Sequence, residues 1–167
     1  MSRTVTCLGL VLGLAMASAG QARSEEKKID RAAVPAAALA AVAKKYPGAK
    51  MVAFEEAEEE GKKLYEIGIE SGTTKMDVEL TADGKIENEE TVITNAELPA
   101  SVKAGLGSSK YKGWKVDKIE KVVKEEKTDN PLYELVVKSK SKKFEVVFDK
   151  DGKLTKEEDK GKEKDND

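Results

Sequence analysis

The sequence predicts an α+β fold of two tandem repeats, each with one helix packed on a four-stranded antiparallel meander sheet. First, the chain has 167 residues, which is enough for one domain or two very small ones. Second, the chain repeats itself at a spacing of 64 to 68 residues, and Met76–Ile86 matches Phe144–Leu154. Third, the apolar period changes from helical to alternating within each repeat.

Each repeat is expected to open with a helix that begins at a proline. Pro35 and Pro99 both suit the first helical position, where a missing backbone N–H costs nothing. The first helix is predicted to run to Tyr46, where Pro47-Gly48 ends it. The second helix contains Gly105 and Gly107, each unfavourable by about 1 kcal/mol relative to alanine. We therefore expect it to be shorter or frayed at its end.

Alternating apolar and polar residues predict the strands. In the first repeat Tyr65, Ile67 and Ile69 alternate with charged or small residues, as half-buried strands with one wet face do. The Asp83-Gly84 and Asp151-Gly152 pairs supply the positive φ that tight hairpins need. The predicted strands lie around residues 51–58, 65–69, 76–80 and 86–93, and then 115–124, 133–137, 144–148 and 154–157.

The two ends of the chain differ from the repeats in their composition. Residues 1–22 have a basic start, an apolar run of about a dozen residues and small residues near Ala22, which predicts a cleaved signal peptide. That run is too short to span a bilayer, so no membrane span is expected after cleavage. Residues 23–33 are predicted to be a linker and 156–167 a disordered charged tail, on either side of repeats at 34–94 and 98–155.

The duplicated motifs resemble a known family. A helix ending in Tyr46-Pro47-Gly48, Leu-Tyr-Glu at 64–66 and 132–134, and Asp-Gly-Lys at 83–85 and 151–153 are similar to the PepSY-like family described as putative β-lactamase-inhibitor-like. The second repeat has Tyr111-Lys112-Gly113 where the first has Tyr-Pro-Gly. The resemblance implies a non-enzymatic, periplasmic or secreted binding module, with inhibition of an enzyme suggested by analogy.

Composition argues against an enzyme. The chain has no histidine, and its one cysteine, Cys7, lies inside the predicted signal peptide. The commonest general base and the usual zinc and haem ligands are therefore missing from the exported chain. We predict no catalytic residue, no cofactor and no metal site. The acidic run at 55–60 is interpreted as a solvated strand end running into a hairpin, because it lacks the ligand alternation of a calcium loop.

Lysines around the predicted second hairpin are the candidate interaction surface. A basic hairpin near aromatic residues can bind anionic partners, although lysine there is also a common guard against aggregation. The overall charge of −2 argues against nucleic acid as a partner. The candidate residues are Trp114, Lys138, Lys140, Lys142 and Lys143.

The charge differs between the repeats. Residues 23–97 hold 11 basic and 17 acidic groups, whereas residues 98–155 hold 14 basic and 9 acidic groups. The halves could attract each other within one chain, pair between chains, or present an acidic face to a basic partner. We favour the internal arrangement, since two cores this small need mutual support.

The functional prediction is an exported, non-catalytic binding module. It would act on an envelope or secreted protein, as an inhibitor or an interaction domain, through strand faces or hairpin tips. The alternative is an envelope protein that binds a small ligand or a divalent cation.

Overall fold

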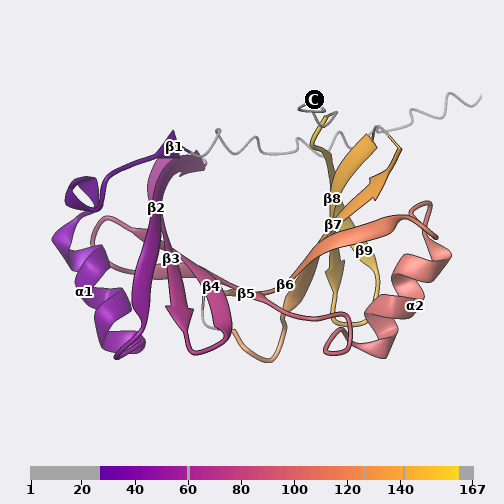
Figure 1. Ribbon diagram of the computed structural model, residues 1–167, viewed down its shortest axis with the longest axis horizontal. Coiled ribbons are helices and arrows are strands. Elements are labelled where there is room, and N and C mark those ends of the chain that lie inside the picture. The colour runs from indigo at the N-terminus through magenta and orange to yellow at the C-terminus, as the bar shows by residue number, and fades with distance from the viewer. Residues whose placement is uncertain (1–26, 60, 126, 141, 162–167) are drawn as a thin grey trace, which may run out of the picture.

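The computed structural model describes residues 27–59, 61–125, 127–140 and 142–161. Its strands form one continuous antiparallel sheet of nine strands within these residues, in the order in which they occur along the chain. The prediction of two repeats, each with one helix on its own four-stranded sheet, is therefore wrong. The structure is mostly sheet, with α-helices at only two places in the described chain (Figure 1).

Element order still follows the duplicated sequence. The first half contains β1 (Lys27–Lys28), the 3₁₀ helix η1 (Arg31–Ala33), α1 (Ala36–Lys45), β2 (Lys50–Glu59), β3 (Lys62–Ser71), β4 (Thr74–Thr81) and β5 (Ile86–Val92). The second half contains α2 (Ala100–Ser108), β6 (Lys115–Lys124), β7 (Leu132–Ser139), β8 (Lys142–Asp149) and β9 (Leu154–Asp159).

The pairing of β5 with β6 joins the two halves. Asn88 lies opposite Lys124, and Val92 lies opposite Glu120. If the halves had separate sheets, both strands would present unpaired backbone N–H and C=O groups at a sheet edge. Pairing them with each other satisfies these groups, and this is the physical reason why one sheet forms instead of two.

Both helices pack on the same face of the sheet, and neither of them covers the other face (Figure 1). In the first half, Ala38 and Val42 of α1 pack over Ile67 and Val78. In the second half, Val102 of α2 packs in a separate cluster with Leu135 and Phe148. All of these side chains are fully buried or nearly so. The sheet bends between the two clusters, so the uncovered face is concave (Figure 1).

The predicted ends fall partly inside the sheet. The expected linker contributes β1, whose residues pair with Glu55 and Glu56 of β2. The strand β9 runs to Asp159, so the first residues of the expected disordered tail are ordered. The predicted signal peptide and residues 162–167 lie outside the described residues. Within the described residues, no helix is both long and apolar enough to cross a membrane.

Candidate binding surface

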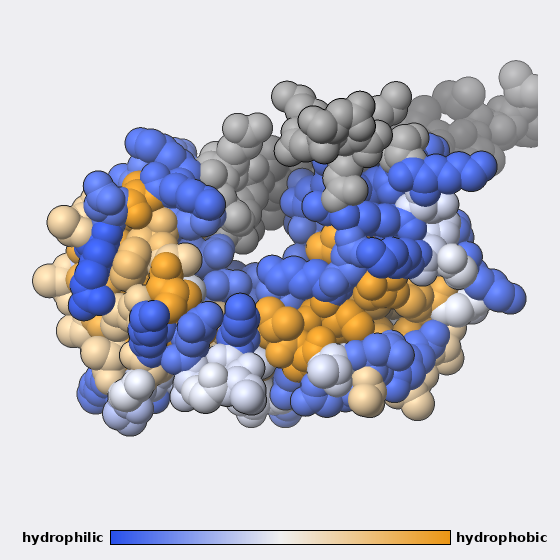
Figure 2. All heavy atoms as spheres, viewed as in Figure 1, coloured by the Kyte–Doolittle hydropathy of each residue, from blue (hydrophilic) through white to orange (hydrophobic). Residues whose placement is uncertain are grey.

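The concave face of the sheet is the most distinctive surface of the molecule. Neither helix covers it, and Figure 2 shows mostly hydrophilic residues around the hollow between the two halves. Several of its side chains are buried although neither helix lies on them; among them are Leu64 and Val122. The face therefore has buried residues on its floor as well as exposed ones at its sides.

Strand register collects carboxylates on this face. Residues directly opposite each other in an antiparallel pair point to the same side of the sheet. Glu66 lies opposite both Glu55 and Glu79, Asp77 lies opposite Glu90, and Glu120 lies opposite Glu134. We call the resulting set the acidic floor; its members are Glu55, Glu66, Asp77, Glu79, Glu90, Glu120, Glu134 and Glu145.

Three members of the acidic floor converge at its centre. Glu90 of β5, Glu120 of β6 and Glu134 of β7 each place a carboxylate oxygen within 4.8 Å of the other two. Glu120 is only 2% exposed, and its Oε1 lies 2.7 Å from Nζ of Lys118. Ionised glutamates this close together repel one another, so electrostatic repulsion is concentrated at this central group.

Burial and crowding change the acidity of this central group. Burial raises the pKa of Glu134 to about 7, and the nearby carboxylates of Glu145 and Glu120 add to the increase. Burial also raises the pKa of Glu120, although Lys118 opposes this effect. Both shifts have the sign expected when a charged carboxylate loses water and meets like charges. The floor therefore takes up a proton at a higher pH than isolated glutamates would.

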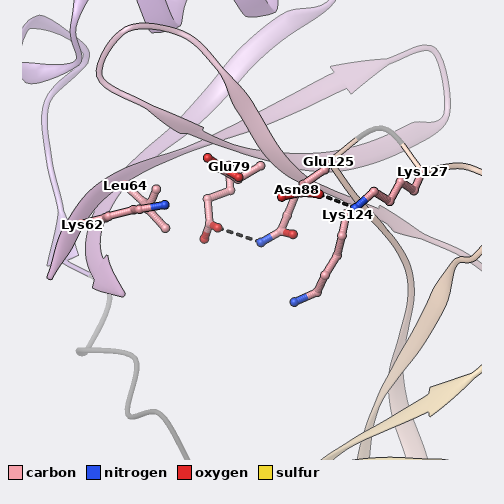
Figure 3. A pocket seen from close by; sticks show the side chains of 8 residues that line it. Lys62, Leu64, Glu79, Asn88, Lys124, Glu125 and Lys127 are labelled. Atoms are coloured by element: carbon pink, nitrogen blue, oxygen red, sulfur yellow. Dashed lines mark hydrogen bonds and ion pairs between the residues drawn. The ribbon is translucent and has the colours of Figure 1, made fainter. Parts of the chain in front are cut away.

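A pocket of about 370 Å³ lies where the two halves meet (Figure 3). Leu64 and Glu79 line it from the first half, and Lys124 lines it from the second. Nδ2 of Asn88 donates a hydrogen bond of 2.8 Å to Oε1 of Glu79 across β5 and β4. Because strand register places these residues on the concave face, the pocket is one end of the same hollow.

One large apolar side chain is exposed beside the acidic centre. Val92 is 39% exposed and lies opposite Glu120 in the β5–β6 pair, on the concave side. The other large apolar side chain exposed in the described residues is Val52, which lies at the bulge of β2 and is 44% exposed.

The structure divides the predicted interaction residues into two groups. Trp114 is half-buried against the second core, with its ring centroid 5.2 Å from that of Tyr111 and 5.9 Å from that of Phe144. The lysines lie on the β7–β8 hairpin: Lys138 is opposite Lys143, and Lys142 is opposite Ser139. Lys140 is exposed where the hairpin turns.

The basic hairpin is partly compensated by an acidic residue. Asp117 pairs with both Lys115 and Lys138, and these contacts lower the pKa of its carboxyl group to about 2. The predicted acidic run at 55–60 lies mainly in β2, where Glu56 pairs with Lys27 and Lys63. Glu60 lies outside the described residues.

The sequence predicted charged wet faces but not their central cluster. Period-two alternation placed Glu66, Asp77, Glu134 and Glu145 on polar strand faces. Convergence of three strands on one point depends on register and on the pairing of β5 with β6, and no local pattern reports either of them. Alternation and the repeated Leu-Tyr-Glu at 132–134 both included Glu134, but neither indicated that it meets Glu90 and Glu120.

Comparison with known proteins gives the same picture of the fold. The family model described as "Putative beta-lactamase-inhibitor-like, PepSY-like" matches residues 21–88 and 73–156. A search of curated proteins found no match.

Similar solved structures come from Bacteroides. A putative periplasmic protein from Bacteroides eggerthii is 19% identical with a TM-score of 0.63, and the match covers 75% of this chain and 88% of that chain. A BLIP-like protein from Bacteroides fragilis is 24% identical with a TM-score of 0.59, covering 80% and 92%. A DUF2874 family protein from Bacteroides uniformis is 20% identical with a TM-score of 0.63, covering 75% and 88%.

Proposed function

We propose that this chain, which belongs to the PepSY-like family described as putative beta-lactamase-inhibitor-like, is a non-catalytic module that binds another protein of the cell envelope. The observation that carries the proposal is the concave sheet face, which neither α1 nor α2 covers (Figure 1). The helices bury one face of this antiparallel sheet, and within the described residues the other face has no second layer and is accessible to a partner. The hollow would receive a convex part of that partner.

Three features support binding without catalysis. The family is described as inhibitor-like, and a similar solved structure is described as BLIP-like. The whole sequence has no histidine and only one cysteine, at position 7. The acidic floor is spread over many strands and both halves, as expected for a surface that recognises shape and charge.

We further propose that the module is periplasmic or secreted. The predicted signal peptide at 1–22 supports export, and the similar Bacteroides eggerthii structure is described as a putative periplasmic protein. An inhibitor or interaction domain acting on an envelope or secreted protein fits this location.

Capture of the partner tests the proposal. The purified chain is immobilised and incubated with the envelope fraction of the producing cells, and bound proteins are identified by mass spectrometry. Val92→Arg places a long cationic side chain on the concave face at an exposed position, where folding tolerates it. Val52→Arg makes the same change at a similarly exposed position on β2 and is the matched control.

We expect one stoichiometric partner that the wild type and Val52→Arg capture and Val92→Arg does not. If the partner is an enzyme, adding the chain to its assay then tests inhibition. Equal capture by both variants would contradict binding through the concave face. Capture of no protein would contradict the proposed function itself.

A further inference from the structure

The two halves contain equivalent hairpins that differ in charge. Ser71 precedes the turn of the β3–β4 hairpin, and Ser139 precedes the turn of the β7–β8 hairpin. We call the second hairpin the basic hairpin; its lysines are Lys138, Lys140, Lys142 and Lys143. The residues at the same positions of the first hairpin are Glu70, Gly72, Thr74 and Lys75. The same hairpin therefore forms without four lysines, so their charge is not a requirement of the fold.

A row of directly opposed residues across three strands shows the difference in charge most clearly. In the first half the charges of this row alternate, and its members are Lys50, Glu70 and Lys75. In the second half all the charges are positive, and the members are Lys115, Lys138 and Lys143. Opposed residues of an antiparallel pair lie on the same side of the sheet, and like charges in that arrangement are unfavourable. An anion beside the second row would relieve this repulsion.

The carboxylate of Asp117 offsets part of the positive charge. It lies 2.8 Å from Nζ of Lys115 and 2.5 Å from Nζ of Lys138, and hydrogen bonds from these two lysines lower its pKa to about 2. The next carboxylate along β8 is that of Glu145, which pairs with Lys160 at 3.0 Å. The lysines of the basic hairpin and Lys115 outnumber Asp117, so this end of the sheet keeps a net positive charge.

The backbone of Lys140 supplies an independent observation. Lys140 has a φ of 52°, in the left-handed region that favours glycine, and Gly72 at the equivalent position has a φ of 61°. A lysine in this conformation is less favourable than a glycine. Its side chain is exposed and adds nothing to either hydrophobic core. The lysine at this position therefore indicates a role outside the fold.

Protection against aggregation is the competing explanation for the lysines. Charged residues commonly guard the open edge of a sheet, where unpaired backbone groups would recruit another chain. Neither strand of the basic hairpin is such an edge, because β7 pairs with β6 and β8, and β8 pairs with β7 and β9. Edge protection therefore does not explain the lysines.

The place of the basic hairpin favours a segment of a protein bound in the hollow. Lys138 lies on the same side of β7 as Glu134 and directly opposite Lys143, so both lysines face the concave side. The other two lysines continue this surface to the turn, at one margin of the hollow (Figure 1). A partner seated in the hollow would meet all four. Charge complementarity then favours a partner that is acidic at this margin.

We propose that the basic hairpin binds an acidic segment, with several aspartate or glutamate residues, of the protein that occupies the concave face. This inference rests on the proposed function and specifies the chemistry of the partner at one margin of the hollow. Carboxylates of the segment would accept charge-assisted hydrogen bonds from the lysine ammonium groups. They would also reduce the repulsion along the row of Lys115, Lys138 and Lys143.

The experiment measures binding of a defined probe by fluorescence anisotropy. A labelled peptide with several glutamates among glycine and serine residues is titrated with the purified chain at about 20 mM and about 150 mM salt. The same peptide with glutamine in place of glutamate controls for charge. Lys143→Gln removes one charge from the basic hairpin. Lys75→Gln is the matched control at the equivalent position of the first hairpin, where the lysine pairs with Glu70.

At the lower salt we expect the wild type to bind the glutamate peptide and not the glutamine peptide. Binding should be roughly threefold to fivefold weaker for Lys143→Gln and unchanged for Lys75→Gln, and the higher salt should weaken binding by the wild type. Equal binding by the wild type, Lys143→Gln and Lys75→Gln would overturn the inference. Binding to vesicles of anionic phospholipid without binding to the peptide would also overturn it, in favour of a membrane surface.

A second variant separates binding from folding at the left-handed position. Lys140→Gly introduces the residue of the first hairpin, and we expect it to weaken peptide binding by roughly twofold to threefold. It should also raise the urea concentration at which half of the protein is unfolded, because glycine adopts a positive φ more readily. A more stable variant that binds the peptide as tightly as the wild type would contradict a binding role for Lys140.

Failure of this inference can be distinguished from failure of the proposed function. If a captured envelope protein binds Lys143→Gln and Lys140→Gly as tightly as the wild type, the module binds a partner but not through an acidic segment. If the peptide binds as expected while no envelope protein is captured, the basic hairpin binds anionic chains and the proposed function is wrong.

Discussion

In both halves of the molecule a hairpin turn packs against the helix, but the turn and the helix lie closer together in the second half. In each half an Asp-Gly turn lies against the helix. A Cβ at Gly84 would lie 2.7 Å from the carbonyl oxygen of Ala37, whereas a Cβ at Gly152 would overlap the carbonyl oxygen of Ser101 more deeply. In the second half the helix itself has a glycine at the contact, and a Cβ at Gly105 would overlap the carbonyl oxygen of Gly152.

This difference explains why α2 contains Gly105, a residue that helix propensity alone would disfavour. The first helix has Ala41 at the position that corresponds to Gly105, and Ala41 fits because the contact in that half is looser. Gly105 weakens α2 as an isolated helix, but it allows the backbone of α2 to approach the backbone of Gly152 closely. Oγ of Ser101 then donates a hydrogen bond of 2.7 Å to the carbonyl oxygen of Lys150. Duplicated units can therefore keep their element order while their packing diverges.

The largest expected effect comes from filling the close contact in the second half. Gly105→Ala should lower the free energy of unfolding by roughly 2 to 3 kcal/mol, because a methyl group would overlap the backbone of Gly152. Helix propensity predicts the opposite sign, a gain of about 1 kcal/mol. Urea denaturation followed by circular dichroism measures the difference. Ala41→Gly is the reciprocal change in α1 and should cost only about 1 kcal/mol. A stabilised Gly105→Ala would contradict the packing argument.

The second comparison concerns two glutamates with opposite environments. The pKa of Glu134 is raised to about 7, mainly by burial, while that of Glu56 is lowered, mainly by its hydrogen bond with Lys63. Between about pH 4.5 and 7 the unfolded chain has Glu134 ionised and the folded chain keeps it protonated. The folded state then binds more protons, so stability falls as the pH rises through this range.

Glu134→Gln should therefore flatten the decrease in stability between about pH 4.5 and 7, by an amount on the order of 2 kcal/mol. Thermal or urea denaturation at several pH values measures this slope. Glu56→Gln should leave the slope unchanged, because a lowered pKa places the titration of Glu56 below the range. The argument fails if both variants retain the wild-type slope.

Helix starts and hairpins could be predicted from the sequence, whereas the way in which the two halves join could not. Pro35, Pro99 and the two Asp-Gly pairs marked helix starts and hairpins, because these residues act through their own backbone geometry. The joining of the halves through β5 and β6 was missed. Strand pairing between repeats depends on which edges meet in space, and the sequence of β5, IENEETV, does not show which strand lies beside it.

The candidate site was predicted only in its parts. Alternation assigned charged residues to wet strand faces, but the sequence drew attention to the lysine-rich hairpin and to Trp114 because they form short, visible clusters. The structure places the Trp114 ring against Tyr111 and Phe144. The glutamates that meet at the centre of the floor are 30 and 14 residues apart along the chain, so their proximity has no local signature.

The smallest expected effect distinguishes the two tyrosines that end the helical segments. Tyr111 is 1% exposed, and its hydroxyl donates to Oε2 of Glu157 at 3.0 Å. The buried hydroxyl of Tyr46, at the corresponding place in the first half, has no hydrogen-bond partner among the described residues.

Removing each hydroxyl therefore tests whether that bond contributes to the second half. Tyr111→Phe should lower the free energy of unfolding by about 0.5 to 1.5 kcal/mol, because it deletes one hydrogen bond whose acceptor, the carboxylate of Glu157, is itself 40% exposed. Tyr46→Phe should be neutral or slightly stabilising, because a buried hydroxyl without a partner is unfavourable. Urea denaturation of both variants and the double variant measures the two effects, which should add because the sites lie in separate cores. Equal losses at both positions would mean that the Tyr46 hydroxyl has a partner, such as a bound water, and that the halves do not differ at this point.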